Sequence, residues 1–203
     1  MKEKLPHILL GLYILEFVVL GVSPYSRDVW VAENTPIVLI VLFLAGMYRN
    51  FRFSNTSYLM MSVLIFMHTV GGHYTFELVP FGYVSDLFGF SRNHYDRIAH
   101  FSVGFYAYPI AEYLYRKGLT ASKGLMAFTG VTAIFTVAAV YEVFEWLYAV
   151  SADPAAGIAV LGSQGDIWDA QKDMLSDGLG AVCAAVFFML RYNFQTPDET
   201  GAI

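Results

Sequence analysis

The sequence predicts an all-α integral membrane protein, a bundle of six transmembrane helices with both termini in the cytoplasm. Of the 203 residues, 57% are hydrophobic and 14% are charged, whereas a soluble domain carries about 25% charged residues. The apolar residues form long runs, and the basic residues gather in alternate connections between these runs. The net charge of −5, without a basic patch, gives no support for nucleic acid as a partner.

Six segments are long and apolar enough to span a bilayer, which takes about 20 residues of α-helix. We expect them at residues 5–22, 29–48, 57–78, 96–115, 123–148 and 168–190. Together they form a single domain, residues 1–192, and a polar tail follows at residues 193–203.

Each segment carries its own signal. The first joins a charged start to an apolar body, as a signal peptide does, but we expect it to remain as the first membrane helix. The second has the shortest apolar run, and Pro36 starts or kinks it. The third and fourth mix apolar residues with His and Asp, and the fifth is largely apolar until "YEVFEW". The sixth starts within "GDIWDAQKDMLSDGLGA" and continues as "AVCAAVFFML".

The basic residues set the orientation. If six helices alternate in direction, the N-terminus, the second and fourth connections and the C-terminal end lie on one side. That side carries Lys2, Lys4, Arg49, Arg52, Arg116, Lys117, Lys123 and Arg191. Because cytoplasmic connections are enriched in Lys and Arg, we expect this side in the cytoplasm.

With this orientation, ionisable residues of four segments fall in the outer half of the membrane. They include His68, His73, Asp96, His100, Glu142 and Glu145. Asp96 and His100 are four residues apart and share a helix face. His68 and His73 are separated by about 140° on an ideal helix, so Gly71 and Gly72 would have to unwind or bulge the helix to bring the two rings together.

The start of the sixth segment adds a stripe of carboxylates. Asp166, Asp169, Asp173 and Asp177 follow at offsets of 0, 3, 7 and 11 residues, which places them within an arc of about 80° on a helix. Asp166 also suits an N-cap, because it precedes the helix. Asp173 and Asp177 lie too far inside the helix for capping.

Such acids are costly in a membrane. An isolated Asp at the centre of a membrane helix costs about 2.5–3.5 kcal/mol on insertion scales. Only Arg97 and Lys172 have clear access among the basic residues, and we expect both at the rim. The remaining acids therefore call for protons or for a divalent metal ion.

The mixture of carboxylate and imidazole favours zinc, with manganese or iron as alternatives, and the excess of acids leaves room for a dinuclear site. The expected ligands are His68, His73, Asp96, His100, Glu142, Glu145, Asp169, Asp173 and Asp177. Glu142 or Asp173 would act as the general base toward a metal-bound water.

Several motifs resemble a known family. The motifs "HTVGGHYTFELVPFG", "FSRNHYDRIAHFSVGF" and "YEVFEW", together with the Asp-rich start of the sixth segment, resemble the YjdF family of bacterial inner-membrane proteins, a domain of unknown function. "DRIAHF" is also distantly similar to VanZ-like proteins, which are associated with glycopeptide resistance, although Asp177 stands where that pattern usually has Asn. The resemblance implies a multi-pass protein of the bacterial inner (plasma) membrane.

Three functions fit these features. The first is a metal-dependent hydrolase or transferase that acts on an envelope lipid at the outer leaflet, with Arg92 and Arg97 near the mouth to hold a phosphate. The alternative is a divalent-cation transporter or a metal-binding module without catalysis, for which Glu112 is the one candidate relay in the inner half. The third is a polar core that is purely structural.

Overall fold

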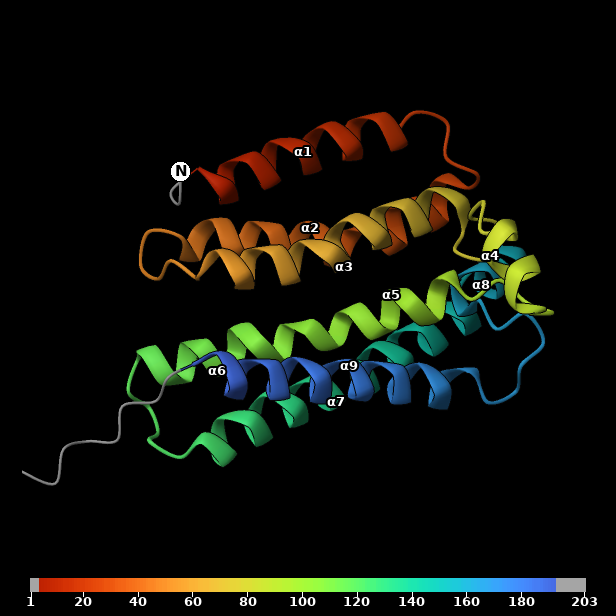
Figure 1. Cartoon of the computed structure of the whole chain (residues 1–203). Coiled ribbons are helices and arrows are strands. Elements are labelled where there is room, and N and C mark those ends of the chain that lie inside the picture. The colour runs from red at the N-terminus through yellow and green to blue at the C-terminus, as the bar shows by residue number, and fades with distance from the viewer. Residues whose placement is uncertain (1–3, 193–203) are drawn as a thin grey trace, which may run out of the picture.

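The computed structural model describes residues 4–192, which form helices and no β-strand. The helices are α1 (Leu5–Leu20), α2 (Arg27–Met47), α3 (Asn55–Tyr74), α4 (Gly82–Phe88), α5 (Tyr95–Val103), the 3-10 turn η1 (Gly104–Tyr106), α6 (Ala107–Arg116), α7 (Lys123–Ser151), α8 (Pro154–Leu161) and α9 (Asp169–Arg191). Figure 1 shows α1, α2 and α3 as one group and α5, α6, α7 and α9 as a second. The polar tail expected at residues 193–203 lies outside the described residues.

All six expected segments are helical, with corrected boundaries. The second starts earlier because the Oγ atom of Ser26 caps α2 by accepting a hydrogen bond from the Val29 amide, and Pro36 lies inside this helix rather than at its start. The third ends at Tyr74, because Thr75 turns into the left-handed region with φ of 61°. The fourth is divided by η1, and the fifth continues to Ser151. The short helices α4 and α8 were not expected.

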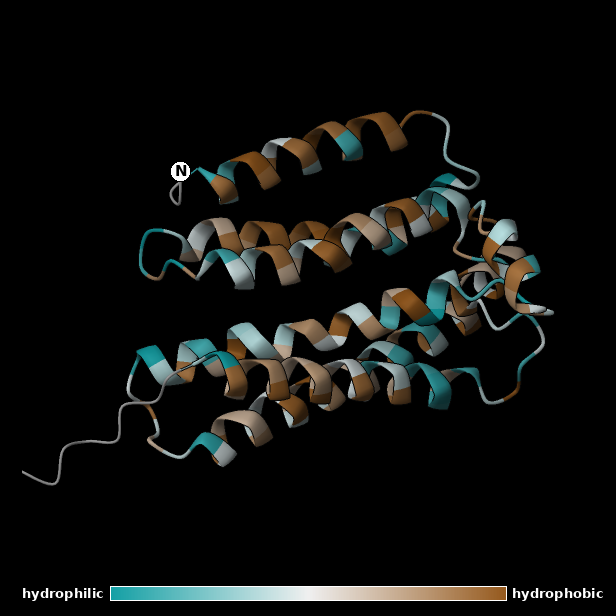
Figure 2. Cartoon of the chain, viewed as in Figure 1, coloured by the Kyte–Doolittle hydropathy of each residue, from teal (hydrophilic) through white to brown (hydrophobic). Residues whose placement is uncertain are grey.

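Three of the helices, α2, α7 and α9, are long and apolar enough to cross a membrane. The 21 residues of α2 extend about 30 Å at 1.5 Å per residue, which matches the hydrocarbon thickness of a bilayer. α1 is a shorter apolar helix. In Figure 2, hydrophilic residues are concentrated toward the helix ends and hydrophobic residues toward their middles.

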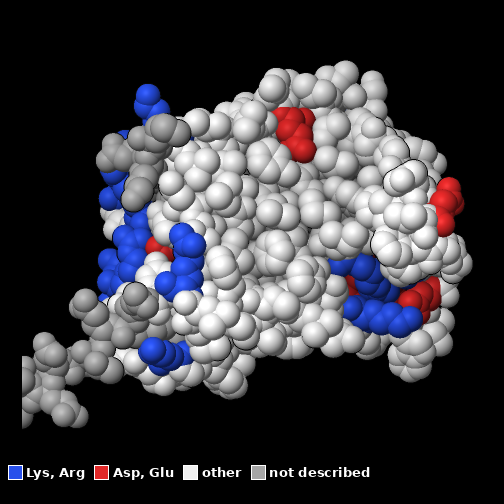
Figure 3. Space-filling model, viewed as in Figure 1, with Lys and Arg blue, Asp and Glu red and all other residues white. Residues whose placement is uncertain are grey.

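The two ends of the bundle differ in charge. α1 starts and α9 finishes at the same end, which also holds the α2–α3 and α6–α7 connections (Figure 1). Lys and Arg gather at that end in Figure 3, and a smaller group of mixed charge lies at the opposite end, near α4 and α8. The basic residues of alternate connections therefore come together in space, while the assignment of their end to the cytoplasm stays a prediction.

Two glycines bring α5 and α9 into backbone contact. A Cβ atom built on Gly180 would lie 2.0 Å from the carbonyl oxygen of Phe101, and one built on Gly104 would lie 2.2 Å from the amide nitrogen of Ala181. Neither position has room for a side chain, as is typical of close helix packing in membranes. The contact sets His100 of α5 beside Asp177 of α9.

We expect Gly180→Ala to lower the melting temperature in detergent, by the equivalent of about 1–3 kcal/mol, because the added methyl group forces α5 and α9 apart. Gly46→Ala is the matched control. A Cβ atom on Gly46 meets nothing within 4 Å, so this change should be neutral or stabilise α2 by up to about 1 kcal/mol. Equal effects of the two substitutions would contradict the close contact.

Candidate functional site

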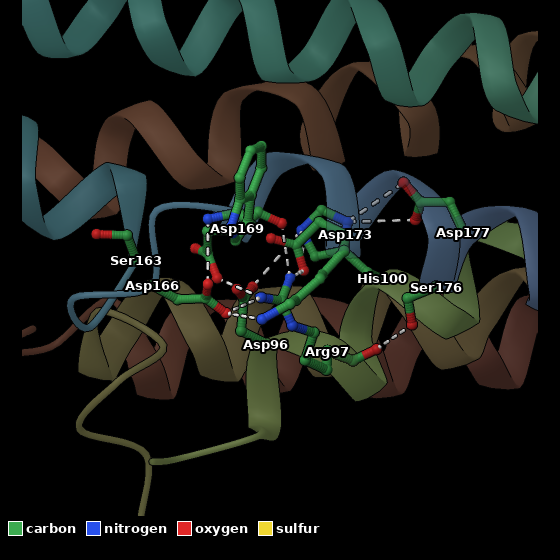
Figure 4. Close-up of polar contacts among 12 residues, drawn as sticks. Asp96, Arg97, His100, Ser163, Asp166, Asp169, Asp173, Ser176 and Asp177 are labelled. Atoms are coloured by element: carbon green, nitrogen blue, oxygen red, sulfur yellow. Dashed lines mark hydrogen bonds and ion pairs between the residues drawn. The ribbon is translucent and has the colours of Figure 1, made fainter.

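A cluster of acids and one histidine joins α5 to α9 (Figure 4). Asp96, His100 and Asp173 each present one ligand atom, and these atoms all lie within 4.8 Å of one another. His100 and Asp173 are buried, and Asp96 is slightly more open. The Nε2 atom of His100 lies 3.6 Å from Asp96 Oδ1 and 3.8 Å from Asp173 Oδ1. These distances suit side chains gathered around a small shared centre rather than bonded directly to one another.

The other ring nitrogen of His100 faces a separate carboxylate. Its Nδ1 atom lies 3.2 Å from Asp177 Oδ1. When Nδ1–H donates to Asp177, the lone pair of Nε2 points toward Asp96 and Asp173. Histidines that bind metals commonly have this arrangement, in which a carboxylate fixes the tautomer and the ring orientation. Asp177, which is almost fully buried, thus orients the ring from behind.

The outer part of the aspartate stripe is neutralised by arginine. Asp169 contacts the guanidinium groups of both Arg92 and Arg97, with 2.7 Å between Arg92 Nη1 and Asp169 Oδ1. Arg97 also contacts Asp173 and donates from Nη1 to the Asp169 carbonyl at 2.9 Å. The expectation that Arg97 and Lys172 are the only accessible cations, both at the rim, is wrong, because Arg92 and Arg97 both reach into the stripe.

Asp166 lies at the surface of the same end. Its Oδ1 accepts a hydrogen bond from the Trp168 amide at 3.1 Å, and its Oδ2 lies 2.6 Å from the Nζ atom of Lys172. The Lys172 hydrogen bond holds the pKa of the Asp166 carboxyl below its usual range. Asp166 therefore organises the turn that precedes α9. Its Oδ2 also lies 3.6 Å from Arg92 Nη1 and 3.5 Å from Arg97 Nη2, and Arg97 in turn contacts Asp173.

A second buried pair, which the sequence analysis missed, involves Glu33 of α2. Glu33 is 2% exposed, and its Oε2 lies 3.1 Å from His68 Nε2 and accepts a hydrogen bond from the Tyr141 hydroxyl at 3.0 Å. Glu33 stands inside the apolar run "WVAENTPIVLIVL", where an acid is as costly to insert into a membrane as the aspartates are. This position in the sequence could have identified Glu33 as a candidate site residue.

The two histidines of α3 do not come together. α3 continues as a regular helix through Gly71 and Gly72 to Tyr74, so the unwinding or bulge considered from the sequence is absent and that hypothesis is wrong. The Nδ1 atom of His73 lies 2.6 Å from the Leu20 carbonyl oxygen, at the end of α1, whereas His68 faces Glu33.

The two glutamates of α7 lack a basic partner. Glu145 is 8% exposed and forms no hydrogen bond or ion pair with the part of the chain that the structure describes. The Oε1 atom of Glu142 is buried without a hydrogen-bond partner among residues 4–192. Glu142 is close enough to His100, Asp173 and Asp177 for its charge to interact with theirs.

A cavity of about 120 Å³ lies among these groups, although Asp173 and Glu142 do not line it. Its polar lining residues are Glu33, His68, Asp96, His100, Tyr141, Glu145 and Asp177. Residues 160–162, at the end of α8, close it on one side. Since a water molecule takes about 30 Å³, the cavity has room for a metal ion with water ligands.

Charge in and around the cavity is unbalanced. Five carboxylates have no Lys or Arg partner within the described residues: Glu33, Asp96, Glu142, Glu145 and Asp177. Buried carboxylates are stable only when they are protonated, paired or bound to a metal. Oxygen and imidazole donors together suit zinc, manganese or iron.

Comparison with known proteins gives one family and one curated relative. A family model described as "Predicted membrane protein (DUF2238)" matches residues 5–193. The chain is 32% identical over 189 residues to the "Inner membrane protein YjdF" of Escherichia coli (strain K12), covering 90% of this chain and 88% of that protein. No solved structure matches the chain. The likeness to VanZ-like proteins stays a prediction.

We expect Arg97→Gln to destabilise the metal-free protein by about 3–5 kcal/mol, because removal of one member of a buried ion pair leaves its carboxylate partners uncompensated. Lys172→Gln is the matched control. The Lys172 side chain is 53% exposed, so its loss should cost less than about 1 kcal/mol. Melting curves in detergent with a chelator measure both effects. Equal losses of stability in the two variants would show that the buried Arg97 contacts stabilise the fold no more than the exposed Lys172 pair does.

Proposed function

The chain belongs to the DUF2238 family of predicted membrane proteins, and we propose that this member binds a divalent metal ion within the membrane and uses it to hydrolyse or transfer a polar group of an envelope lipid. The observation that carries the proposal is the donor set of Asp96, His100 and Asp173, whose ligand atoms lie within 4.8 Å of one another at the edge of a polar cavity. The carboxylates around that cavity that have no described Lys or Arg partner also favour the binding of a cation.

Each donor has a defined part. His100 would bind through Nε2, because Asp177 occupies Nδ1. Asp173 Oδ1 faces both Arg97 and His100 Nε2, and a carboxylate oxygen has more than one lone pair, so it can keep its contact with Arg97 and still bind the metal. Asp96 supplies the third ligand from the turn of α5 that precedes His100. Zinc suits this set best, and manganese or iron is the alternative.

A second ion would find donors in the same cavity. Glu33 and His68 lie 3.1 Å apart, and Glu145 lines the cavity without a partner of its own. Glu33, His68 and Glu145 would hold the second ion of a dinuclear site, which would add a second Lewis acid beside the first.

The reaction requires a base near the bound water. Asp96, His100 and Asp173 would hold the metal ion, which would supply a more acidic water and a Lewis acid for an ester or phosphoryl oxygen. Glu142 suits the role of general base better than Asp173, because its Oε1 is free of hydrogen bonds while Asp173 contacts Arg97. Arg92 and Arg97, which both contact Asp169 beside the donor set, can share their charge between Asp169 and a lipid phosphate.

The proposal includes an orientation. Six transmembrane helices, with both termini in the cytoplasm, would place the cavity on the outer side of the bacterial inner membrane. The gathering of basic residues at the end of the bundle opposite the cavity supports this placement, as does the name of the relative, an inner membrane protein.

Two alternatives receive less support. A cation transporter needs polar groups along the inner half, but Glu112 there is already bound by Ser54, Ser57 and Arg116. A purely structural core would need partners for Glu142 and Glu145, and those two residues have none among the described residues.

Metal content tests the site directly. We expect purified protein to contain zinc, manganese or iron by elemental analysis, and His100→Gln and Asp96→Asn to lose it. Asp177→Asn should bind metal about 10–100-fold more weakly, because it only orients the ring. Asp86→Asn, at an exposed position of α4, is the control that retains the metal.

The same proteins should differ in melting temperature with and without metal. A metal present at a thousandfold excess over its Kd stabilises the folded state by about 4 kcal/mol. That gain should vanish in His100→Gln and remain in Asp86→Asn. If verified metal removal leaves the melting temperature of the wild type unchanged, the polar cluster is a structural core and the proposed function is wrong.

Orientation is tested by cysteine labelling in a Cys183→Ala background. Asp86→Cys in α4 and Ala155→Cys in α8 should react with a membrane-impermeant maleimide added outside the cell membrane. Asn50→Cys and Leu119→Cys, at the opposite end, should react only after permeabilisation. All four positions are exposed, so the reversed pattern would place the cavity on the cytoplasmic side.

A further inference from the structure

A large apolar cavity adjoins the polar one. It measures about 590 Å³ and extends between α2 and α3 on one side and η1, α6 and α7 on the other. Ile40, Phe43 and Leu44 line it from α2, Ile110 from α6, and Ile134 from α7. Nearly every lining side chain is apolar, so this cavity offers almost nothing to which water or an ion could bind.

The two cavities adjoin along a shared wall. Ile40, Leu64, Val103 and Val137 line both of them. Val103 comes one turn after His100 in α5, so the junction between the cavities lies directly beside the donor set. Tyr106 near this junction donates its hydroxyl hydrogen to the Met61 carbonyl at 3.1 Å, and that polar group is therefore satisfied by the protein itself.

The apolar cavity also opens toward the membrane. Phe43 of α2 is 64% exposed although it lines the cavity, and Val137 of α7 is largely exposed as well. α2 packs against α3 and α8, whereas α7 packs against α6, α8 and α9. The outer faces of α2 and α7 carry further exposed apolar side chains, including Leu42 and Val140, as expected of surfaces that contact hydrocarbon.

We infer that the apolar cavity holds a fatty acyl chain of a membrane phospholipid, which enters sideways between α2 and α7 while the polar part of the lipid occupies the cavity at His100. The inference deepens the proposed function and depends on it for the role of the polar cavity. A chain that moves from the bilayer into this cavity stays in an apolar environment throughout. An ester or phosphate near the head of the lipid would then lie beside Asp96, His100 and Asp173.

The experiment uses the full chain in nanodiscs with phosphatidylethanolamine that carries a photoactivatable diazirine on its acyl chain. After irradiation, mass spectrometry should find adducts on Ile110 and Ile134, which line the cavity. Ile134 is almost fully buried, so bulk lipid cannot label it. Absence of both adducts in the wild type would overturn the inference.

Two neighbouring substitutions on α2 sharpen the test. Ile40→Trp fills the junction and should abolish the adduct on Ile134. Leu39→Trp adds the same ring to a side chain that points outward, at 61% exposure, and should leave the adduct unchanged. If Ile40→Trp fails to fold, Ile110→Trp takes its place. An adduct that persists in a folded cavity-filling variant contradicts the inference.

The metal content of the same samples separates this inference from the proposed function. If the wild type labels Ile134 but contains no metal even after metal is added, the acyl-chain site stands and the metal chemistry is wrong. If metal is bound but Ile134 is not labelled, the acyl-chain site is wrong and the metal site stands.

Discussion

The backbone contact between α5–η1 and α9 is the constraint on which the site depends. Gly104 and Gly180 leave no room for a side chain between these segments. The distances from His100 to Asp173 and Asp177 depend on that contact, because both aspartates come from α9. Asp96 lies one turn before His100 in α5 itself. In a membrane the hydrophobic effect does not drive helices together, so close packing of this kind has to supply the attraction. The glycines thus allow the two segments to approach each other, and this approach brings the aspartates of α9 close to His100.

Charge is distributed unevenly along α9. The outermost aspartates are paired with Lys172, Arg92 and Arg97, and this part of the stripe resembles an ordinary ion-pair network. Farther inward, the only described partner of Asp177 is the imidazole of His100. An arginine is permanently charged, whereas an imidazole can accept a proton or bind a metal. The change from guanidinium to imidazole along one helix face therefore marks the passage from a fixed structural network to a site whose charge can vary.

The sequence predicted the helices well and the side-chain partners less well. Long apolar runs are sufficient to place helices, and the acid stripe was sufficient to direct attention to α9 and to Asp96 and His100. The short helices α4 and α8 were missed because helices of two turns have no clear periodic signal. Glu33 was missed because its importance depends on Tyr141, which is 108 residues away in the sequence. Arg92 was placed at the mouth, and only the path of the loop before α5 shows that it reaches Asp169.

The position of the polar cavity on top of an apolar one limits what kind of molecule can use it. A soluble substrate could satisfy the donors near His100, but it would leave the apolar cavity empty, and empty apolar volume costs packing energy. A hydrocarbon alone would fill the lower cavity and leave the carboxylates uncompensated. The proposed amphiphile and metal ion would together satisfy both parts. The same reasoning separates the site from a channel. An ion that left the polar cavity toward the opposite end would enter a volume whose described lining is almost entirely apolar, where hardly any group could replace its water.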